Sequence, residues 1–144
     1  MRHLCLPVGV CLLFLIAGCS GRPSNWKETI PVTGVVYVDG EPAEGVQIMF
    51  HPDGGMDQEQ PTETKAMSDK EGKFAASTYE LGDGAPVGSY TLTIEWPKLN
   101  TISMTFDGDQ LGGKYAKVEK SEWKIEVVSG EPIDLGQIDL KAKR

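Results

Sequence analysis

The feature that most constrains the fold is a series of short segments in which apolar and polar residues alternate, separated by clusters of turn-forming residues. The clearest segment covers residues 90–96, where Tyr, Leu, Ile and Trp alternate with Thr, Thr and Glu. A period of two residues is typical of a β-strand that buries one face, and no stretch after residue 29 sustains the period of an α-helix. The sequence therefore predicts an all-β domain.

The alternating segments and their turns predict about seven strands. Residues 32–38 are rich in β-branched side chains, and Asp39-Gly40 after them predicts a tight turn. A change of phase at Gly136 predicts a β-bulge in the last strand. We expect residues 73–78 to return as the hairpin partner of the strand before them, with Phe74 facing the core. Strands at hairpin spacing are typical of an antiparallel β-sandwich, here with strands expected at 32–38, 46–51, 64–67, 73–78, 90–96, 123–127 and 133–140.

The first 18 residues differ from the rest and predict an export signal. Arg2 and His3 precede an apolar run of 13 residues, Leu4–Ile16. A transmembrane helix needs about 20 apolar residues, so this run has the length of a signal-peptide core instead. We expect residues 1–18 to be removed, which leaves Cys19 as the first residue of the mature chain.

Ile16-Ala17-Gly18-Cys19 resembles the lipobox of bacterial lipoproteins, in which an aliphatic and two small residues precede a cysteine. The resemblance implies cleavage between Gly18 and Cys19 and a diacylglycerol on the Cys19 sulfur. Each buried CH₂ of such a lipid contributes about 0.8 kcal/mol of membrane affinity. The alternative interpretation is an ordinary signal with a chance cysteine. Ser20 stands where an aspartate would favour the inner membrane, so the outer membrane or the cell surface is expected.

The mature chain divides into a tether and one domain. Residues 19–29 are polar, with a proline and a glycine, and predict a short tether between lipid and domain. Trp26 is expected to touch the lipid interface or to pack on the edge of the domain, which covers 30–144. Both cysteines other than Cys19 lie in the signal, so the domain forms no disulfide and depends on its core for stability.

The charge of the chain restricts its partners. The full chain has a net charge of −7, and the mature chain has 13 basic against 21 acidic residues, a net charge of −8. An acidic protein repels the phosphates of nucleic acid and of anionic lipids. We therefore expect no nucleic-acid partner, and we expect the N-terminal lipid to hold the chain at the membrane.

Three motifs resemble carboxypeptidase regulatory-like and transthyretin-like (prealbumin-type) domains, and they occur in the order of that family. The first has a Gly-x-Val pair, a small turn and a Pro-x-x-Gly-Val hairpin, and the others are a Ser-Asp-x-x-Gly-x-Phe turn and a Pro-x-Gly-x-Tyr-x-Leu strand entry. They cover Val32 to Val46, Ser68 to Phe74 and Pro86 to Leu92. The resemblance implies a seven-stranded β-sandwich but no chemistry, because a fold does not determine a function.

The mature chain holds few residues of the kinds that catalysis needs. His51 is its one histidine, so it cannot form the usual multi-histidine zinc site. The pairs Asp69 and Glu71, and Asp107 and Asp109, lack the spacing of a calcium-binding EF-hand and are expected to be turn residues. We therefore assign no catalytic residue, no metal ligand and no cofactor.

Residues 97–120 are the least regular part of the domain and predict a long acidic loop with one helical turn. Tyr115 lies in this loop and is the best candidate for an exposed surface contact. Trp96 and Trp123 fall on apolar strand faces, so we expect them to pack against the core and not to form a sugar-binding platform.

These observations leave three hypotheses for function. The first is a lipid-anchored, non-enzymatic module of the cell envelope that contacts other envelope proteins or glycans. The second is a small metal-dependent or hydrolytic enzyme that uses the loop at 97–120. The third is an accessory subunit of an envelope assembly or secretion complex.

Overall fold

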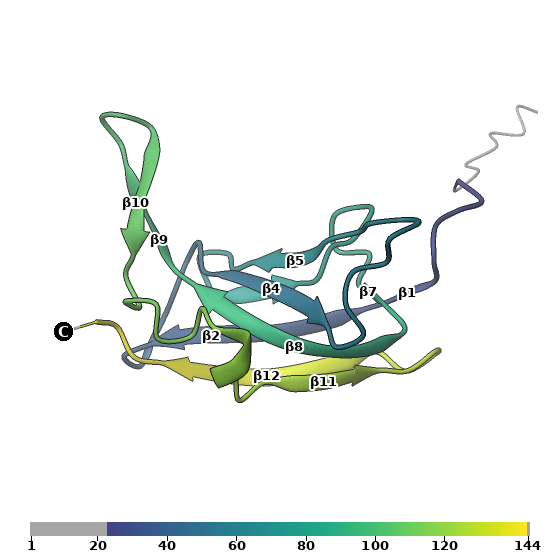
Figure 1. Ribbon diagram of the computed structural model, residues 1–144. Helices are drawn as coiled ribbons and strands as arrows, with labels where there is room; N and C mark the ends of the chain where they lie inside the picture. The colour runs from purple at the N-terminus through teal and green to yellow at the C-terminus, as the bar shows by residue number, and fades with distance from the viewer. Residues whose placement is uncertain (1–22, 144) are drawn as a thin grey trace, which may run out of the picture.

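The computed structural model describes residues 23–143, so the predicted cleavage and lipidation site at Gly18 and Cys19 lies outside the described residues. Two β-sheets pack face to face over one core, which confirms the predicted all-β sandwich (Figure 1). One sheet has the strand order β11-β8-β4-β5, and the other places β2 between β12 and the two strands β3 and β6. The seven main strands are β2 (Val32–Val38), β4 (Gln47–Pro52), β5 (Thr64–Met67), β6 (Lys73–Ala75), β8 (Gly88–Glu95), β11 (Lys124–Val127) and β12 (Ile133–Leu140).

Shorter elements complete the domain. β1 (Thr29–Ile30) pairs with β7 (Ala85–Pro86), and β3 (Glu41–Pro42) closes the tight turn after β2. β9 (Pro97–Asn100) and β10 (Thr105–Asp109) form a separate hairpin, and Val118–Lys120 form one 3₁₀ turn. Among residues 23–143, no helix is long and apolar enough to cross a membrane.

One strand pair departs from the expected antiparallel arrangement. β12 runs parallel to β2, whereas the other paired strands of the described chain run antiparallel. The turn after β11 carries the chain across to the other sheet, so β12 does not fold back on the strand that precedes it. The predicted bulge in β12 is confirmed, because its register against β2 shifts between Asp134 and Gln137, and Gly136 has a φ of 65°.

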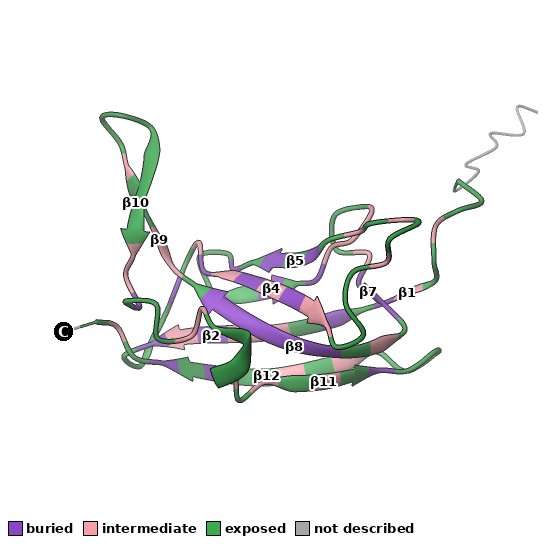
Figure 2. Cartoon of the chain, viewed as in Figure 1, coloured by how far each residue is buried: buried purple, intermediate pink, exposed green. Residues whose placement is uncertain are grey.

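The core is formed by side chains from the inner faces of both sheets, as Figure 2 shows for β4 and β8. β4 follows the predicted alternation, with Ile48 and Phe50 buried and their neighbours less so. β8 differs, because Thr91 and Thr93 on its outer face are buried as well. Their hydroxyls have partners: Thr91 donates to Asp53 at 2.8 Å, and Thr93 lies 2.7 Å from the His51 Nε2 atom.

The prediction that β5 and β6 form a hairpin is wrong for β6 itself, and only the residues after β6 meet β5. At one end Lys65 and Ser77 exchange two backbone hydrogen bonds, of 3.0 and 2.8 Å, while β6 itself pairs with β2. Phe74 is buried as expected, and it lies opposite Gly34 of β2. A Cβ atom at Gly34 would lie 2.7 Å from the Phe74 ring. Burial of this ring in the core, which the missing side chain allows, therefore draws β6 into the other sheet.

Candidate binding surfaces

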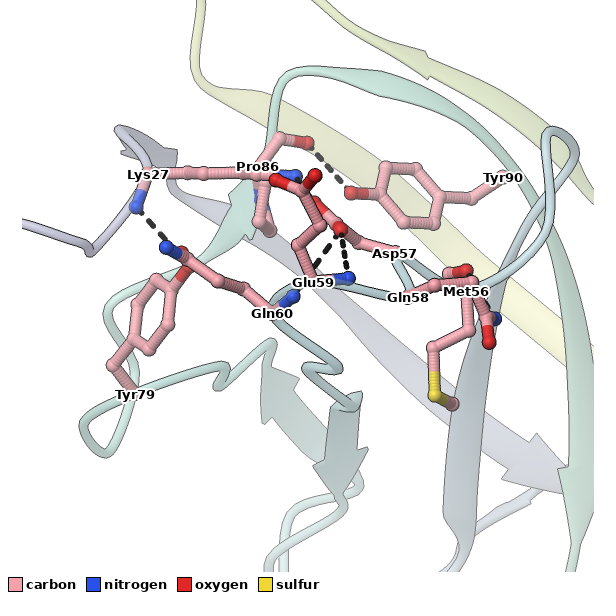
Figure 3. Close-up of polar contacts among 9 residues, drawn as sticks. All are labelled: Lys27, Met56, Asp57, Gln58, Glu59, Gln60, Tyr79, Pro86 and Tyr90. Atoms are coloured by element: carbon pink, nitrogen blue, oxygen red, sulfur yellow. Dashed lines mark hydrogen bonds and ion pairs between the residues drawn. The ribbon is translucent and has the colours of Figure 1, made fainter.

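The N-terminal segment is attached to one end of the sandwich by three contacts, of which Figure 3 shows the two made by Lys27. The ring of Trp26 stacks on that of Tyr79, with 4.7 Å between centroids and 9° between planes. The Lys27 backbone N–H donates to the Tyr79 hydroxyl at 3.1 Å, and the Lys27 Nζ atom lies 2.6 Å from the Asp57 carboxylate. Trp26 thus packs on the domain, one of its two predicted positions. We call these contacts the clasp.

The ion pair in the clasp lowers the pKa of its carboxyl group. The hydrogen bond from Lys27 is the main cause that lowers the pKa of Asp57 from 3.8 to about 2, and the backbone N–H groups of Gln60 and Glu59 lower it further. The same bond raises the pKa of Lys27. Both side chains face solvent, so the pair positions the tether but contributes little to the stability of the whole domain.

A small cavity of about 190 Å³ lies between the clasp and Tyr90. Burial raises the pKa of Tyr90, and its hydroxyl donates to the Pro86 carbonyl at 2.9 Å (Figure 3). Lys27 and Asp57 also line this cavity, where each is already paired with the other. The polar groups named here are therefore engaged within the protein.

A larger groove opens where β5 and β6 separate, with a volume of about 750 Å³. Its apolar lining includes Met49, Met67, Phe74 and Leu81. Two of these side chains are well exposed, Met67 at 58% and Leu81 at 98%. Cavities that bind small ligands hold about 300–1,000 Å³ and are mostly apolar, so this groove has the size and lining of a binding site.

The backbone also contributes to the groove. The backbone N–H and C=O groups of alternate residues in a strand point to opposite sides of the strand. In Lys65 this pair of groups points outward, away from β4, and bonds to Ser77. The next outward pair on β5 belongs to Met67, and the outward pair on β6 belongs to Ala75. Among residues 23–143, β5 and β6 share no strand pairing beyond the isolated bridge between Lys65 and Ser77. The groove therefore offers backbone donors and acceptors beside its apolar side chains.

The rim of the groove is charged but balanced. Glu63 and Asp69 are acidic, whereas Lys65 and Lys73 are basic, and Lys65 lies 3.5 Å from the Glu63 carboxylate. A rim with equal numbers of both signs does not select a strongly charged ligand.

A short loop connects the groove to the clasp. Tyr79 holds the tether, and Leu81 two residues later lines the groove. The Asp83 carboxylate accepts hydrogen bonds from the backbone N–H groups of Thr78 and Tyr79, at 2.7 and 3.2 Å. The groove therefore adjoins the place where the N-terminal segment joins the domain.

The hairpin of β9 and β10 is a second apolar surface. It extends away from the two sheets, and Figure 2 shows most of it exposed. Its exposed apolar side chains are Leu99, Ile102 at 96%, Met104 at 73% and Phe106 at 62%. The region predicted as an irregular loop therefore contains a regular hairpin, followed by the expected helical turn at Val118–Lys120.

Tyr115, the predicted contact residue, is half-buried against the sandwich. Its ring packs on Trp123 with 5.5 Å between centroids, and the Lys114 Nζ atom lies 4.8 Å from the ring centre. Its hydroxyl accepts a hydrogen bond from the Lys141 backbone at 3.1 Å. Tyr115 therefore has a clear packing role, and its contact role stays a prediction. Trp96 and Trp123 pack against the core as expected.

Asp69 and Glu71 lie in the turn before β6, as expected, whereas Asp107 and Asp109 lie in β10 and not in a turn, which corrects that prediction. The Asp69 carboxylate accepts backbone hydrogen bonds from Glu71 and Lys73, at 3.0 and 2.8 Å. Asp107 accepts a hydrogen bond from the Asn100 side chain at 2.8 Å, and Asp109 accepts three from backbone N–H groups. Within the described range no cluster of three or more His, Cys, Asp or Glu side chains could hold a metal ion.

Comparison with known proteins gives only distant likenesses. The sequence matches no known family model and no curated protein. Two solved structures are similar in shape: BcpA, the major pilin subunit of Bacillus cereus, and a 9R-lipoxygenase from Cyanothece PCC8801. The pilin is 10% identical with a TM-score of 0.46, over 81% of this chain and 30% of the pilin. The lipoxygenase is 13% identical with a TM-score of 0.40, over 78% of this chain and 16% of the enzyme. This chain thus spans less than a third of either protein.

Proposed function

We propose that this chain is a lipid-anchored module of the cell envelope with a non-enzymatic binding role. Cys19 carries the lipid, the clasp joins the tether to the domain, and the groove between β5 and β6 binds an apolar segment of another envelope protein. The observation that supports the binding role is the groove itself, because about 750 Å³ of mostly apolar surface lies open beside the tether.

The lining of the groove favours a protein segment over a glycan. Glycans need polar partners and flat aromatic faces, whereas the most exposed apolar side chains of this groove are Met67 and Leu81, and its one aromatic ring, Phe74, is buried in the core. Methionine side chains are flexible and adapt to varied apolar partners. An extended peptide could also pair with the outward backbone groups of Met67, as added strands do in other peptide-binding domains.

Fractionation of cells tests the anchor. We expect the Cys19→Ala protein to lose its lipid and to leave the detergent-extracted membrane fraction that holds the wild-type protein. Mass spectrometry of the wild-type N-terminus should find a diacylated cysteine as the first residue. An unmodified N-terminus, or a different first residue, would contradict the proposal.

Crosslinking in cells tests the groove. A photoreactive amino acid in place of Leu81 should crosslink to a protein partner, and the added substitution Met67→Asp should abolish that crosslink by placing a charge in the groove. The matched control replaces Met56, which is half-exposed but outside the groove lining. Equal crosslinking from both positions, or a crosslink that survives Met67→Asp, would exclude the groove as the binding site.

A further inference from the structure

The tip of the β9–β10 hairpin has a chemistry unlike the rest of the protein. Residues 99–106 read Leu-Asn-Thr-Ile-Ser-Met-Thr-Phe and include no charged residue, although 24% of the chain is charged. The four apolar side chains of this tip are all exposed. A single hairpin is at best marginally stable in water, so exposed side chains of this size indicate a surface that covers them.

Several polar groups of the tip are bonded to one another, and the Asn100 side-chain N–H also donates to the Asp107 carboxylate, just outside the tip, at 2.8 Å. The Asn100 side-chain oxygen accepts hydrogen bonds from the backbone N–H groups of Ile102 and Ser103, at 3.0 and 3.2 Å. The Ser103 and Thr105 hydroxyls lie 2.7 Å apart. Moving an unpaired polar group into an apolar medium is costly, and these internal bonds reduce that cost. The tip can therefore enter an apolar environment with little change in structure.

The hairpin and the tether leave the sandwich at opposite ends of β8. β7 pairs with β1 near the start of β8, and β9 follows its end. The eight residues of β8 separate these ends by about 26 Å, at 3.3 Å per residue. In Figure 1 the hairpin and the tether, from residue 23 onward, both extend upward beyond the sheets. One flat surface above the domain would meet both.

The tether leaves room between the lipid and the clasp. Six residues separate Cys19 from Trp26 and can span about 20 Å when extended. We infer that the hairpin tip inserts into the surface of the same bilayer that holds the Cys19 lipid, so that the domain lies lengthwise on the membrane. This inference rests on the proposed lipid anchor.

The charge distribution indicates a neutral region of the bilayer. The acidic body is repelled by anionic headgroups, whereas the uncharged tip is not. Insertion therefore depends on the apolar side chains of Ile102, Met104 and Phe106, and it should persist in vesicles of purely zwitterionic lipid.

The experiment uses the thiol-free mature domain. With Cys19 acylated and residues 1–18 removed, Ile102→Cys supplies a single thiol for an environment-sensitive fluorophore. We expect the mature lipoprotein, reconstituted in phosphatidylcholine vesicles, to show blue-shifted emission and quenching by spin-labelled lipids. The matched control is Glu126→Cys on β11, which lies on the side away from the hairpin in Figure 1 and should stay water-exposed.

A second variant tests the apolar side chains. With the fluorophore at Ser103→Cys, the substitutions Ile102→Asp and Phe106→Asp should return its emission to that of water while the protein still floats with the vesicles. If the fluorophore at position 102 and the one at position 126 both show the emission typical of water, the membrane inference is overturned but the anchor is not. A crosslink from position 102 to a protein in cells would then assign the tip to protein binding. Failure of the wild-type protein to float would overturn the anchor instead.

Discussion

At the scale of single residues, the absence of a side chain allows the N-terminal strand to dock. Gly84 precedes β7, has a φ of +102°, and approaches β1 so closely that a Cβ atom would lie 2.0 Å from the Ile30 carbonyl oxygen. Gly130, in the turn before β12, also has a positive φ, but a Cβ atom there would meet nothing within 4 Å. Substitutions at these two glycines therefore distinguish the cost of backbone strain, which both would have, from the cost of a steric clash, which only Gly84 would have.

We predict that Gly84→Ala destabilises the protein by about 3 kcal/mol or more, because strain and a backbone clash add together. Gly130→Ala should cost only the left-handed strain, roughly 1–2 kcal/mol. Urea unfolding of both variants measures the difference. Equal losses of stability would mean that β1 moves away from position 84 without resistance.

At the scale of elements, segments far apart in the sequence meet through a few side chains. The clasp joins the tether to two separate loops, one through Tyr79 and the other through Asp57. The groove likewise results from β5 and β6 joining different sheets. In both places the contacts between elements, and not the elements alone, create the surface.

The clasp should weaken in acid. Because the folded pKa of Asp57 is lowered, its stabilising effect is fully present above its ordinary pKa of 3.8 and is lost as the pH falls through about 2. Lys27→Gln should raise this pKa toward 3.8 without reaching it, since the backbone N–H groups of Glu59 and Gln60 remain. An NMR titration of the Asp57 carboxyl carbon measures the shift, and Lys65→Gln, outside the clasp, should leave it unchanged.

At the scale of the whole molecule, the sandwich keeps three surfaces apart. In Figure 1 the N-terminal segment that forms the clasp joins one end of the sandwich and the hairpin leaves the other. The groove is lined by residues of β5 and β6, where these two strands separate. The single core connects the two sheets, while the exposed tip of the hairpin makes no part of it. The hairpin tip should therefore be dispensable for folding.

Replacing residues 99–106 by an Asn-Gly turn should change the free energy of unfolding by no more than about 0.5 kcal/mol, as for other surface changes. For comparison, Ile48→Ala in the core should cost roughly 2–5 kcal/mol. Thermal unfolding compares the two variants. A loss from the hairpin replacement as large as that from Ile48→Ala would show that the hairpin supports the fold.

The local features of this protein follow from short stretches of its sequence. The alternation at 123–127 marks β11, whose observed bounds are Lys124–Val127, and Asp39-Gly40 forms the expected turn with φ angles of 52° and 90°. The bulge at Gly136 was also visible as a change of phase. Such features depend on neighbouring residues, because side-chain period and turn conformation are properties of short segments.

The pairing of the strands, and the surfaces that result from it, depend on contacts between distant parts of the chain. The period of a strand shows that one face is buried but not which strand lies beside it, so the parallel pairing of β12 with β2 left no local signal. β6 pairs with β2 and not with β5 because Phe74 packs against Gly34, which lies 40 residues earlier in the sequence. Met67 and Leu81 came together in one groove for the same reason: long-range packing, not local pattern, sets their distance.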